Sequence, residues 1–170
     1  MRSHFMYAKY LLRHKWFVFI ECSRRGLFWN GLVHDTSKFF PSEWFPYVRF
    51  FYGKDSKQES RESRYQSIQT AQGYFQRAWQ KHLMRNNHHW QNWINIQDAG
   101  NQVIMEMPEK YAVEMICDWI GAGRAQGYYN KKHPLYEVKK WYKKNMSKII
   151  LHPNTRAHIE EEVLGDAYDR

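Results

Sequence analysis

Apolar side chains recur at steps of three and four residues along most of this chain, and this spacing repeats on one face of an α-helix. The chain also has few valines and threonines and only five prolines, so it offers little of the alternating pattern that indicates strands. A length of 170 residues suits one domain with a substantial core and is short for two. We therefore predict an all-α protein, a single compact helical domain over residues 1–170 with about six to seven helices.

Breaks in the apolar pattern separate the predicted helices. We expect helices over residues 5–25, 34–40, 42–52, 65–90, 109 to Gly121 or Gly123, 135–149 and 155–164. The stretch 53–64 has mixed charges and no large apolar side chain, so we expect a flexible charged loop there. We also expect a loop over residues 97–102 and an acidic C-terminal tail over residues 160–170.

The formal net charge of +9 suits anionic ligands such as nucleotides, phosphorylated metabolites or nucleic acid. Lysines concentrate between positions 131 and 148, together with Trp141 and Tyr142. Such a segment is typical of a nucleic-acid surface, and also of a solvated helix face beside a buried aromatic stripe, which we favour. No apolar run approaches the roughly eighteen residues of a membrane span, so we expect no membrane association and a cytoplasmic location.

The two cysteines, Cys22 and Cys117, fall within amphipathic patterns, so we expect buried thiols rather than a disulfide or a zinc site. Because the chain has no Cys-x-x-Cys motif, histidine and carboxylate side chains would have to hold any metal ion. These ligand types favour manganese, magnesium, iron or zinc.

The stretch His34-Asp35-Thr36-Ser37-Lys38 is the strongest candidate for such a site. On the helix expected over residues 34–40, His34 and Asp35 can share one divalent ion that lies over their common edge. Lys38 follows Asp35 by three residues, so its ammonium reaches the same edge, where an anionic substrate would lie. The alternative is an ordinary helix start, in which Asp35 or Thr36 caps the helix and Lys38 is solvated.

Further candidate ligands lie on the core-facing sides of other predicted helices. His14 shares its face with apolar residues of the first helix, and His82 is in line with the core positions of its own. His89 continues the face of His82, whereas a regular helix would displace His88 from it. For each histidine taken alone, the alternative is a structural imidazole.

Two carboxylates, Glu114 and Asp118, lie one turn apart on a largely apolar predicted helix. Carboxylates in such a setting need a cation. Arg85 and Arg124 are candidates to contact an anionic substrate, although other arginines of the chain carry the same chemistry.

The order of these residues resembles the HD superfamily of metal-dependent phosphohydrolases: a histidine, a His-Asp pair with a lysine three residues later, further histidines and a late aspartate. In that superfamily the core ligands come from separate helices of one all-helical domain, and additional histidines bring in a second metal ion. The resemblance implies a first metal ion held by His14, His34, Asp35 and Asp118, and a second held by His82 with His88 or His89.

Three shorter patterns carry a closer resemblance. They are HDTSKF at 34–39, N-x-HHW at 86–90 and EMICDW at 114–119. These patterns are similar to those of a small family found in phages and bacteria, and this second resemblance implies no particular activity.

The predicted function is hydrolysis of a phosphoester or phosphoanhydride in a nucleotide or other small phosphorylated anion, with one or two divalent metal ions. In this interpretation Asp35 can bridge two ions and Lys38 neutralises charge that develops on the phosphorus. Glu114 either orients His34 or His82, or acts as a general base.

Two other functions stay open. Some members of the HD superfamily hold two irons and activate dioxygen, so the first alternative is an HD-type di-iron oxygenase. The second is a protein without enzymatic activity, because a basic, aromatic-rich helical chain can also bind nucleic acid or a host protein.

Overall fold

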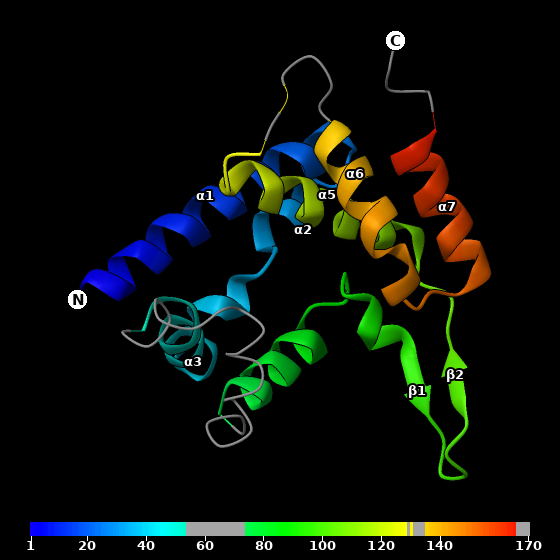
Figure 1. Ribbon diagram of the computed structural model, residues 1–170, viewed down its shortest axis with the longest axis horizontal. Coiled ribbons are helices and arrows are strands. Elements are labelled where there is room, and N and C mark those ends of the chain that lie inside the picture. Colours follow the sequence, from blue (N-terminus) through cyan, green and yellow to red (C-terminus); the bar gives the residue numbers. More distant parts are fainter. Residues whose placement is uncertain (54–73, 129, 131–134, 166–170) are drawn as a thin grey trace. The chain divides into compact units, whose positions relative to one another are not determined.

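The computed structural model describes residues 1–53, 74–128, 130 and 135–165, and these residues are mostly helical, as predicted (Figure 1). The named helices are α1 Arg2–Arg24, α2 Phe28–Val33, α3 Pro41–Tyr52, α5 Glu109–Ala125, α6 Tyr136–Asn145 and α7 Pro153–Leu164. A further helical segment covers residues 74–85. Short 3-10 helices occupy η1 Thr36–Phe39, η3 Trp90–Trp93 and η4 Met146–Lys148.

Two strands form a small antiparallel hairpin that the helical pattern did not predict. Strand β1 covers Ile94–Ile96 and β2 covers Gln102–Ile104, with Ile94 opposite Ile104. The loop expected over residues 97–102 includes the whole connection between them, residues 97–101, while Gln102 begins β2. Gly100 takes a positive φ of 80° in this connection. Strands of three residues are too short to produce a recognisable alternation of apolar and polar side chains.

The helix expected over residues 34–40 is present only as the 3-10 helix η1, and it does not include His34 and Asp35. His34 and Asp35 lie between α2 and η1, and Asp35 has a left-handed backbone with φ 53°. A left-handed residue cannot continue a right-handed helix, so the chain turns at this point. A second difference is that the helical segment 74–85 ends before His88 and His89, which were expected on it.

Some of the expected features fall outside the described residues. They are positions 54–64 of the flexible charged loop, positions 65–73 of the helix expected over 65–90, and positions 166–170 of the acidic tail. Positions 160–164 of that tail belong to α7. The fifth predicted helix continues past both glycines to Ala125.

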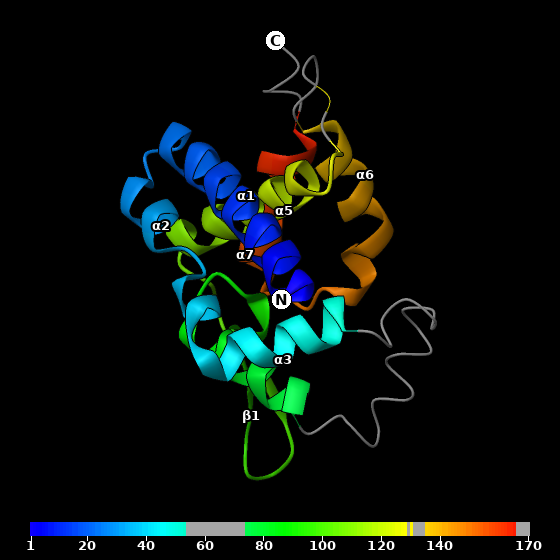
Figure 2. The same cartoon turned by 90° about the vertical axis from the view of Figure 1, so that its left-hand side faces the viewer.

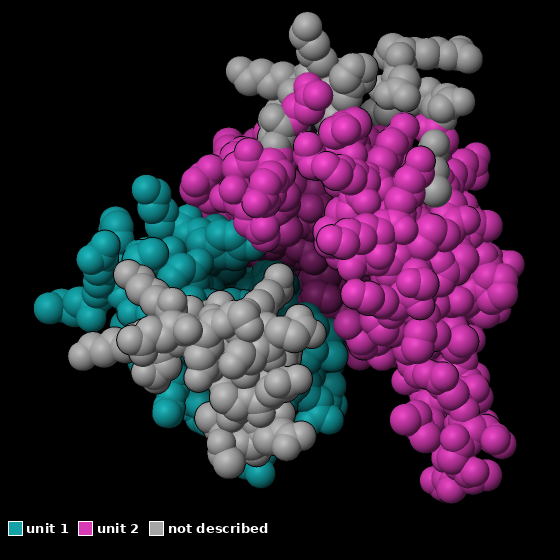
Figure 3. Space-filling view, in the orientation of Figure 1, with its two compact units in different colours: residues 1–12, 35–86 teal, residues 13–34, 87–170 magenta. Residues whose placement is uncertain are grey.

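The chain divides into two compact units, which Figure 3 colours separately. Unit 1 comprises Met1–Leu12 and Asp35–Asn86, and unit 2 comprises Arg13–His34 and Asn87–Arg170. Helix α1 therefore contributes its first half to unit 1 and its second half to unit 2. The expectation of a single domain stays a prediction, and each unit is described by itself.

Unit 1 has an aromatic core. Tyr7 from α1, Tyr47 from α3 and Phe75 from the segment 74–85 are buried together. Phe50 stacks on Phe75 with ring centroids 4.0 Å apart and planes 8° from parallel. Large rings bury more apolar area per residue than aliphatic side chains, which lets a small unit form a core from few residues.

Unit 2 packs α5 against both α6 and α7, and Figure 2 shows these three helices from a second direction. Their buried side chains include Met115 and Ile116 of α5, Tyr142 of α6 and Ile159 of α7. A separate apolar cluster joins α1 to α5 and contains Val18, Cys22 and Cys117.

Both cysteines are free and buried, as predicted. The hydrogen bond that Cys22 makes with Cys117, together with burial, raises the pKa of the Cys22 thiol. The two residues therefore behave as small apolar side chains that pack α1 against α5. Among the described residues, no helix has both the length and the apolarity that crossing a membrane requires.

The contact between α1 and α5 depends on Gly121. A Cβ atom at this position would lie 2.4 Å from Cγ2 of Val18 and 3.0 Å from its backbone nitrogen. Val18 has little freedom to move its γ methyl groups, because a β-branched side chain in a helix strongly prefers one rotamer. His14 lies one turn before Val18, and Asp118 lies three residues before Gly121, so this approach also brings those two residues together.

We expect Gly121→Ala to lower the free energy of unfolding by about 1 to 3 kcal/mol, because the added methyl group overpacks the contact with Val18. Urea unfolding followed by circular dichroism measures the change. The matched control is Gly123→Ala, where the nearest atom to the new Cβ is 3.5 Å away. There the higher helix propensity of alanine should stabilise the protein by up to about 1 kcal/mol. Equal effects of the two substitutions would contradict the assigned packing.

Candidate metal centre

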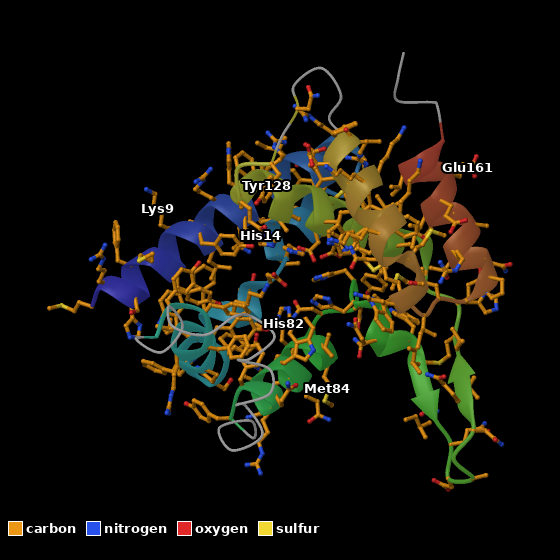
Figure 4. All side chains as sticks on the ribbon, viewed as in Figure 1. Lys9, His14, His82, Met84, Tyr128 and Glu161 are labelled. Carbon is orange, nitrogen blue, oxygen red and sulfur yellow. The ribbon has the colours of Figure 1, made fainter. Side chains whose placement is uncertain are left out.

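Two imidazoles and a carboxylate converge in the interior of unit 2. His14 lies on α1 (Figure 4). Its Nε2 lies 3.1 Å from Oδ1 of Asp118 on α5, and Nε2 of His34 lies 3.5 Å from the same oxygen. The two Nε2 atoms are 3.4 Å apart. When two donor atoms each lie about 2.1 Å from the same metal ion, the distance between the donor atoms depends on the coordination geometry. It is about 3.0 Å for neighbouring ligands of an octahedral ion and about 3.4 Å for those of a tetrahedral ion. The three atoms therefore have the spacing of ligands to a single metal ion.

The protonation state of Asp118 suits this role. Burial raises the pKa of its carboxyl group, but hydrogen bonds from His14 and His34 outweigh burial and hold the pKa well below its ordinary value. Asp118 is thus an ionised carboxylate, the form that binds cations. The side chain of Asp118 is 17% exposed, whereas that of His14 is 3% exposed and that of His34 is fully buried.

Glu114 orients His34. Its Oε1 lies 3.0 Å from Nδ1 of His34, and its Oε2 accepts a hydrogen bond of 2.9 Å from Asn30 of α2. A carboxylate at Nδ1 keeps a proton on that nitrogen, so Nε2 is the nitrogen of His34 that can give up its proton and bind a metal ion. Burial raises the pKa of Glu114, but its hydrogen bonds with His34 and His88 outweigh burial and lower the pKa to about 2. Lys15 adds a further restraint, since its Nζ donates to the carbonyl oxygen of His34.

His88 is the member of the His88-His89 pair that approaches Glu114. Its Nδ1 lies 3.2 Å from Oε1 of Glu114, and its ring packs on that of His34 with centroids 4.3 Å apart. His89 is half-buried and packs on His88. His88, His89 and Asp118 each have one potential ligand atom in this region, and these three atoms all lie within 4.8 Å of one another. The sequence expected a regular helix to displace His88 from the face of His82, but this expectation does not apply, because the helix ends at residue 85.

Unit 1 holds a second arrangement of imidazole and carboxylate, around His82 (Figure 4). Nε2 of His82 lies 3.3 Å from Oδ1 of Asp35, and Nδ1 lies 3.0 Å from Oε2 of Glu43. The side chains of all three residues are fully buried. Burial lowers the pKa of His82 even though both carboxylates oppose the shift. A neutral imidazole retains the lone pair that a metal ion would need.

Glu43 is the site residue that the sequence reasoning missed. Besides His82, it accepts hydrogen bonds from Ser37 at 2.9 Å and from Arg85 at 2.6 Å. Burial raises the pKa of Glu43, but these hydrogen bonds outweigh it, and the pKa lies below its ordinary value. The sequence did carry a signal, since Glu43 lies one helical turn before the core residue Tyr47 and therefore shares its buried face.

The cationic side chains predicted to contact substrate all have carboxylate partners. Lys38 pairs with Asp35, which confirms that these residues lie on the same edge. Arg85 bonds to Glu43, and Arg124 bonds to Glu21. Substrate binding by Arg85 and Arg124 stays a prediction, because these ion pairs already explain where both guanidinium groups lie.

The structure brings together three of the four ligands predicted for the first ion, and it places Asp35, the predicted bridging residue, beside His82. His14, His34 and Asp118 meet in unit 2, and Asp35 meets His82 in unit 1. The sharing of one ion by His34 and Asp35 stays a prediction, as does the sharing of a second ion by His82 with His88 or His89. For Glu114, the structure selects His34 from the two imidazoles that the sequence left open.

We expect Glu114→Gln to weaken Mn²⁺ binding by about 10- to 100-fold, because the amide loses the charge that orients and polarises His34. Titration calorimetry on metal-free protein measures the affinity, and circular dichroism verifies that the helices remain. Glu109→Gln is the matched control, since Glu109 is exposed in the first turn of the same helix. An unchanged affinity in Glu114→Gln would show that Glu114 does not support a metal ligand.

Comparison with known proteins places the chain in a protein family. A sequence model for a protein family, described as "Family of unknown function (DUF5662)", matches residues 3–164. All the candidate site residues of both units lie within this range. Neither a curated protein nor a solved structure matches the chain. The comparison therefore supplies a family but no activity.

Proposed function

We propose that this chain, which belongs to the DUF5662 family, is a metal-dependent phosphohydrolase acting on a nucleotide or another small phosphorylated anion. The observation that carries the proposal is the spacing of the donor atoms of His14, His34 and Asp118, which suits one divalent ion. The resemblance of the ligand order to the HD superfamily supports the same interpretation. We also propose a cytoplasmic location, where such substrates are abundant.

The residues present fit a divalent metal ion. Imidazole nitrogens and a carboxylate oxygen suit manganese, iron or zinc, and carboxylates also bind magnesium. Both cysteines are committed to the apolar cluster between α1 and α5, so thiolate ligands do not enter the set. A divalent ion bound there would lower the pKa of a coordinated water and polarise a phosphoryl oxygen.

The chain's own residues have separate roles in this proposal. Glu114 keeps His34 in the tautomer that presents Nε2, and its further contacts with Asn30 and His88 favour this orienting role over general base catalysis. Lys38, held by Asp35, supplies positive charge that would stabilise negative charge developing on the phosphoryl oxygens. The net charge of +9 attracts anionic substrates to the protein.

Unit 1 supports the proposal of a second ion. In each unit, Nε2 of a histidine lies near an aspartate, and Nδ1 of the same histidine contacts a glutamate. In unit 2, His34 lies between Asp118 and Glu114. In unit 1, His82 lies between Asp35 and Glu43. A carboxylate behind the imidazole is the usual support of a histidine that binds a metal. We therefore propose that Asp35 and His82 contribute ligands to a second divalent ion.

The first test is the metal content of the purified protein, measured by mass spectrometry on wild type and on Asp118→Ala. We expect one or two equivalents of a transition metal in the wild type and a loss of at least one equivalent in the variant, with helicity unchanged. Asp98→Ala is the matched control, since Asp98 is an exposed aspartate of the hairpin connection. Full metal occupancy in Asp118→Ala would show that the ligand assignment is wrong.

The second test is release of inorganic phosphate from a panel of nucleotides in the presence of Mn²⁺. The proposal expects release by the wild type and its loss in both His34→Ala and Asp118→Ala. Iron in the purified protein, with oxygen consumption and no phosphate release, would favour the di-iron oxygenase instead. A protein that neither contains nor takes up metal would contradict both enzymes. Salt-dependent nucleic-acid binding that survives chelation would then support the non-enzymatic alternative.

A further inference from the structure

A cavity of about 570 Å³ lies in unit 2, between α5 with the residues that follow it and α6. This volume falls within the range of about 300 to 1,000 Å³ that small-molecule sites occupy. The residues around it are separate from the candidate metal ligands His14, His34 and Asp118. The proposed hydrolase chemistry therefore leaves this cavity unexplained.

Three aromatic side chains line the cavity. Trp119 of α5 and Trp141 of α6 have ring centroids 5.0 Å apart, and Tyr128 follows α5 (Figure 4). Trp141 is 43% exposed and Tyr128 is 62% exposed. Gly123 forms part of the wall without a side chain, which leaves room beside these rings. A planar ligand can stack on such surfaces.

Trp141 is partly exposed and does not belong to the buried core of unit 2. The lysine-rich segment was expected to have Trp141 and Tyr142 together in a buried aromatic stripe, but only Tyr142 is fully buried. Tyr142 packs in the core of unit 2, with its hydroxyl donating to Glu160 of α7. Trp141 instead presents an aromatic surface to the cavity and to solvent.

The side chains around the cavity carry more positive than negative charge, which favours an anionic ligand. Lys140 and Lys144 lie one turn apart on α6, both are exposed, and both line the cavity. Arg124 also lines it, but its ion pair with Glu21 already neutralises much of its charge. Glu137 is the one carboxylate among the described lining residues, so the balance is positive. Aromatic surfaces beside paired lysines match the base and the phosphates of a nucleotide.

We propose that this cavity is a nucleotide-binding site that is independent of the metal centre. The base stacks on Trp141 and its aromatic neighbours, and the phosphates contact Lys140 and Lys144. Because the cavity residues are separate from the metal ligands, binding here requires no metal ion. This inference goes beyond the proposed hydrolysis and does not depend on it.

The test is titration calorimetry with ADP on the full chain in the presence of EDTA, so that neither metal binding nor turnover contributes. We expect saturable binding of one ADP by the wild type. Trp141→Leu should weaken it by about tenfold or more, as loss of a stacking ring does elsewhere. The matched control is Trp29→Leu, which removes a tryptophan that is 72% exposed on α2 and away from the cavity lining. Equal weakening by both variants would overturn the proposal.

A second pair of variants tests the phosphate contacts. Lys140→Ser combined with Lys144→Ser should weaken ADP binding by about tenfold and reduce its dependence on salt concentration. Lys143→Ser combined with Lys148→Ser removes the same charge from exposed positions that do not line the cavity, and it should leave the affinity nearly unchanged. An equal loss in both double variants would reveal nonspecific attraction to a basic surface and overturn the proposal.

A third variant fills the cavity without removing any contact group. Gly123→Leu places a side chain in the space beside the aromatic rings and should abolish ADP binding, while circular dichroism verifies that the helices persist. Full binding by this variant would overturn the proposal, as would the absence of ADP binding to the wild type in EDTA. Either result would leave the metal content and the phosphate-release tests of the hydrolase unaffected.

Discussion

The close approach of α1 to α5 is the contact on which unit 2 depends. Gly121 lets the backbone of α5 lie against Val18, where any larger side chain would collide. The same two helices bury Cys22 against Cys117 and hold His14 beside Asp118. A packing constraint in an apolar contact thus determines the distance between two potential metal ligands, because helices are stiff and their side chains repeat every turn.

A second constraint is that a buried ionisable group needs partners for its charge, and each unit provides these partners in the same way. Glu114 of unit 2 and Glu43 of unit 1 each contact an imidazole and further hydrogen-bond donors. Removing charges from water is costly unless their partners are well placed, and such interior pairs seldom add stability over apolar packing. Their presence inside both units therefore favours a chemical role over a structural one.

Sequence reasoning succeeded where a single helix face carried the information. The periodicity indicated most helices, the buried cysteines and the buried positions of His14 and His82, because each depends on spacing within one helix. It was wrong about His34 and Asp35, which lie outside a helix because Asp35 turns the chain with a left-handed backbone. It also extended the helix that carries His82 too far, since the helical segment ends at residue 85.

The sequence alone determined that the chain is mostly helical, which side chains are candidates to bind a metal, and that Lys38 would lie on the same edge as Asp35. Each of these follows from residue types and from separations of a few positions, where the local backbone limits what can meet. Only the tertiary structure decided that Glu114 orients His34, that Glu43 supports His82, and that Trp141 lines a cavity while Tyr142 enters the core. These contacts join residues from different helices or different faces of one helix, and their geometry depends on how the helices pack.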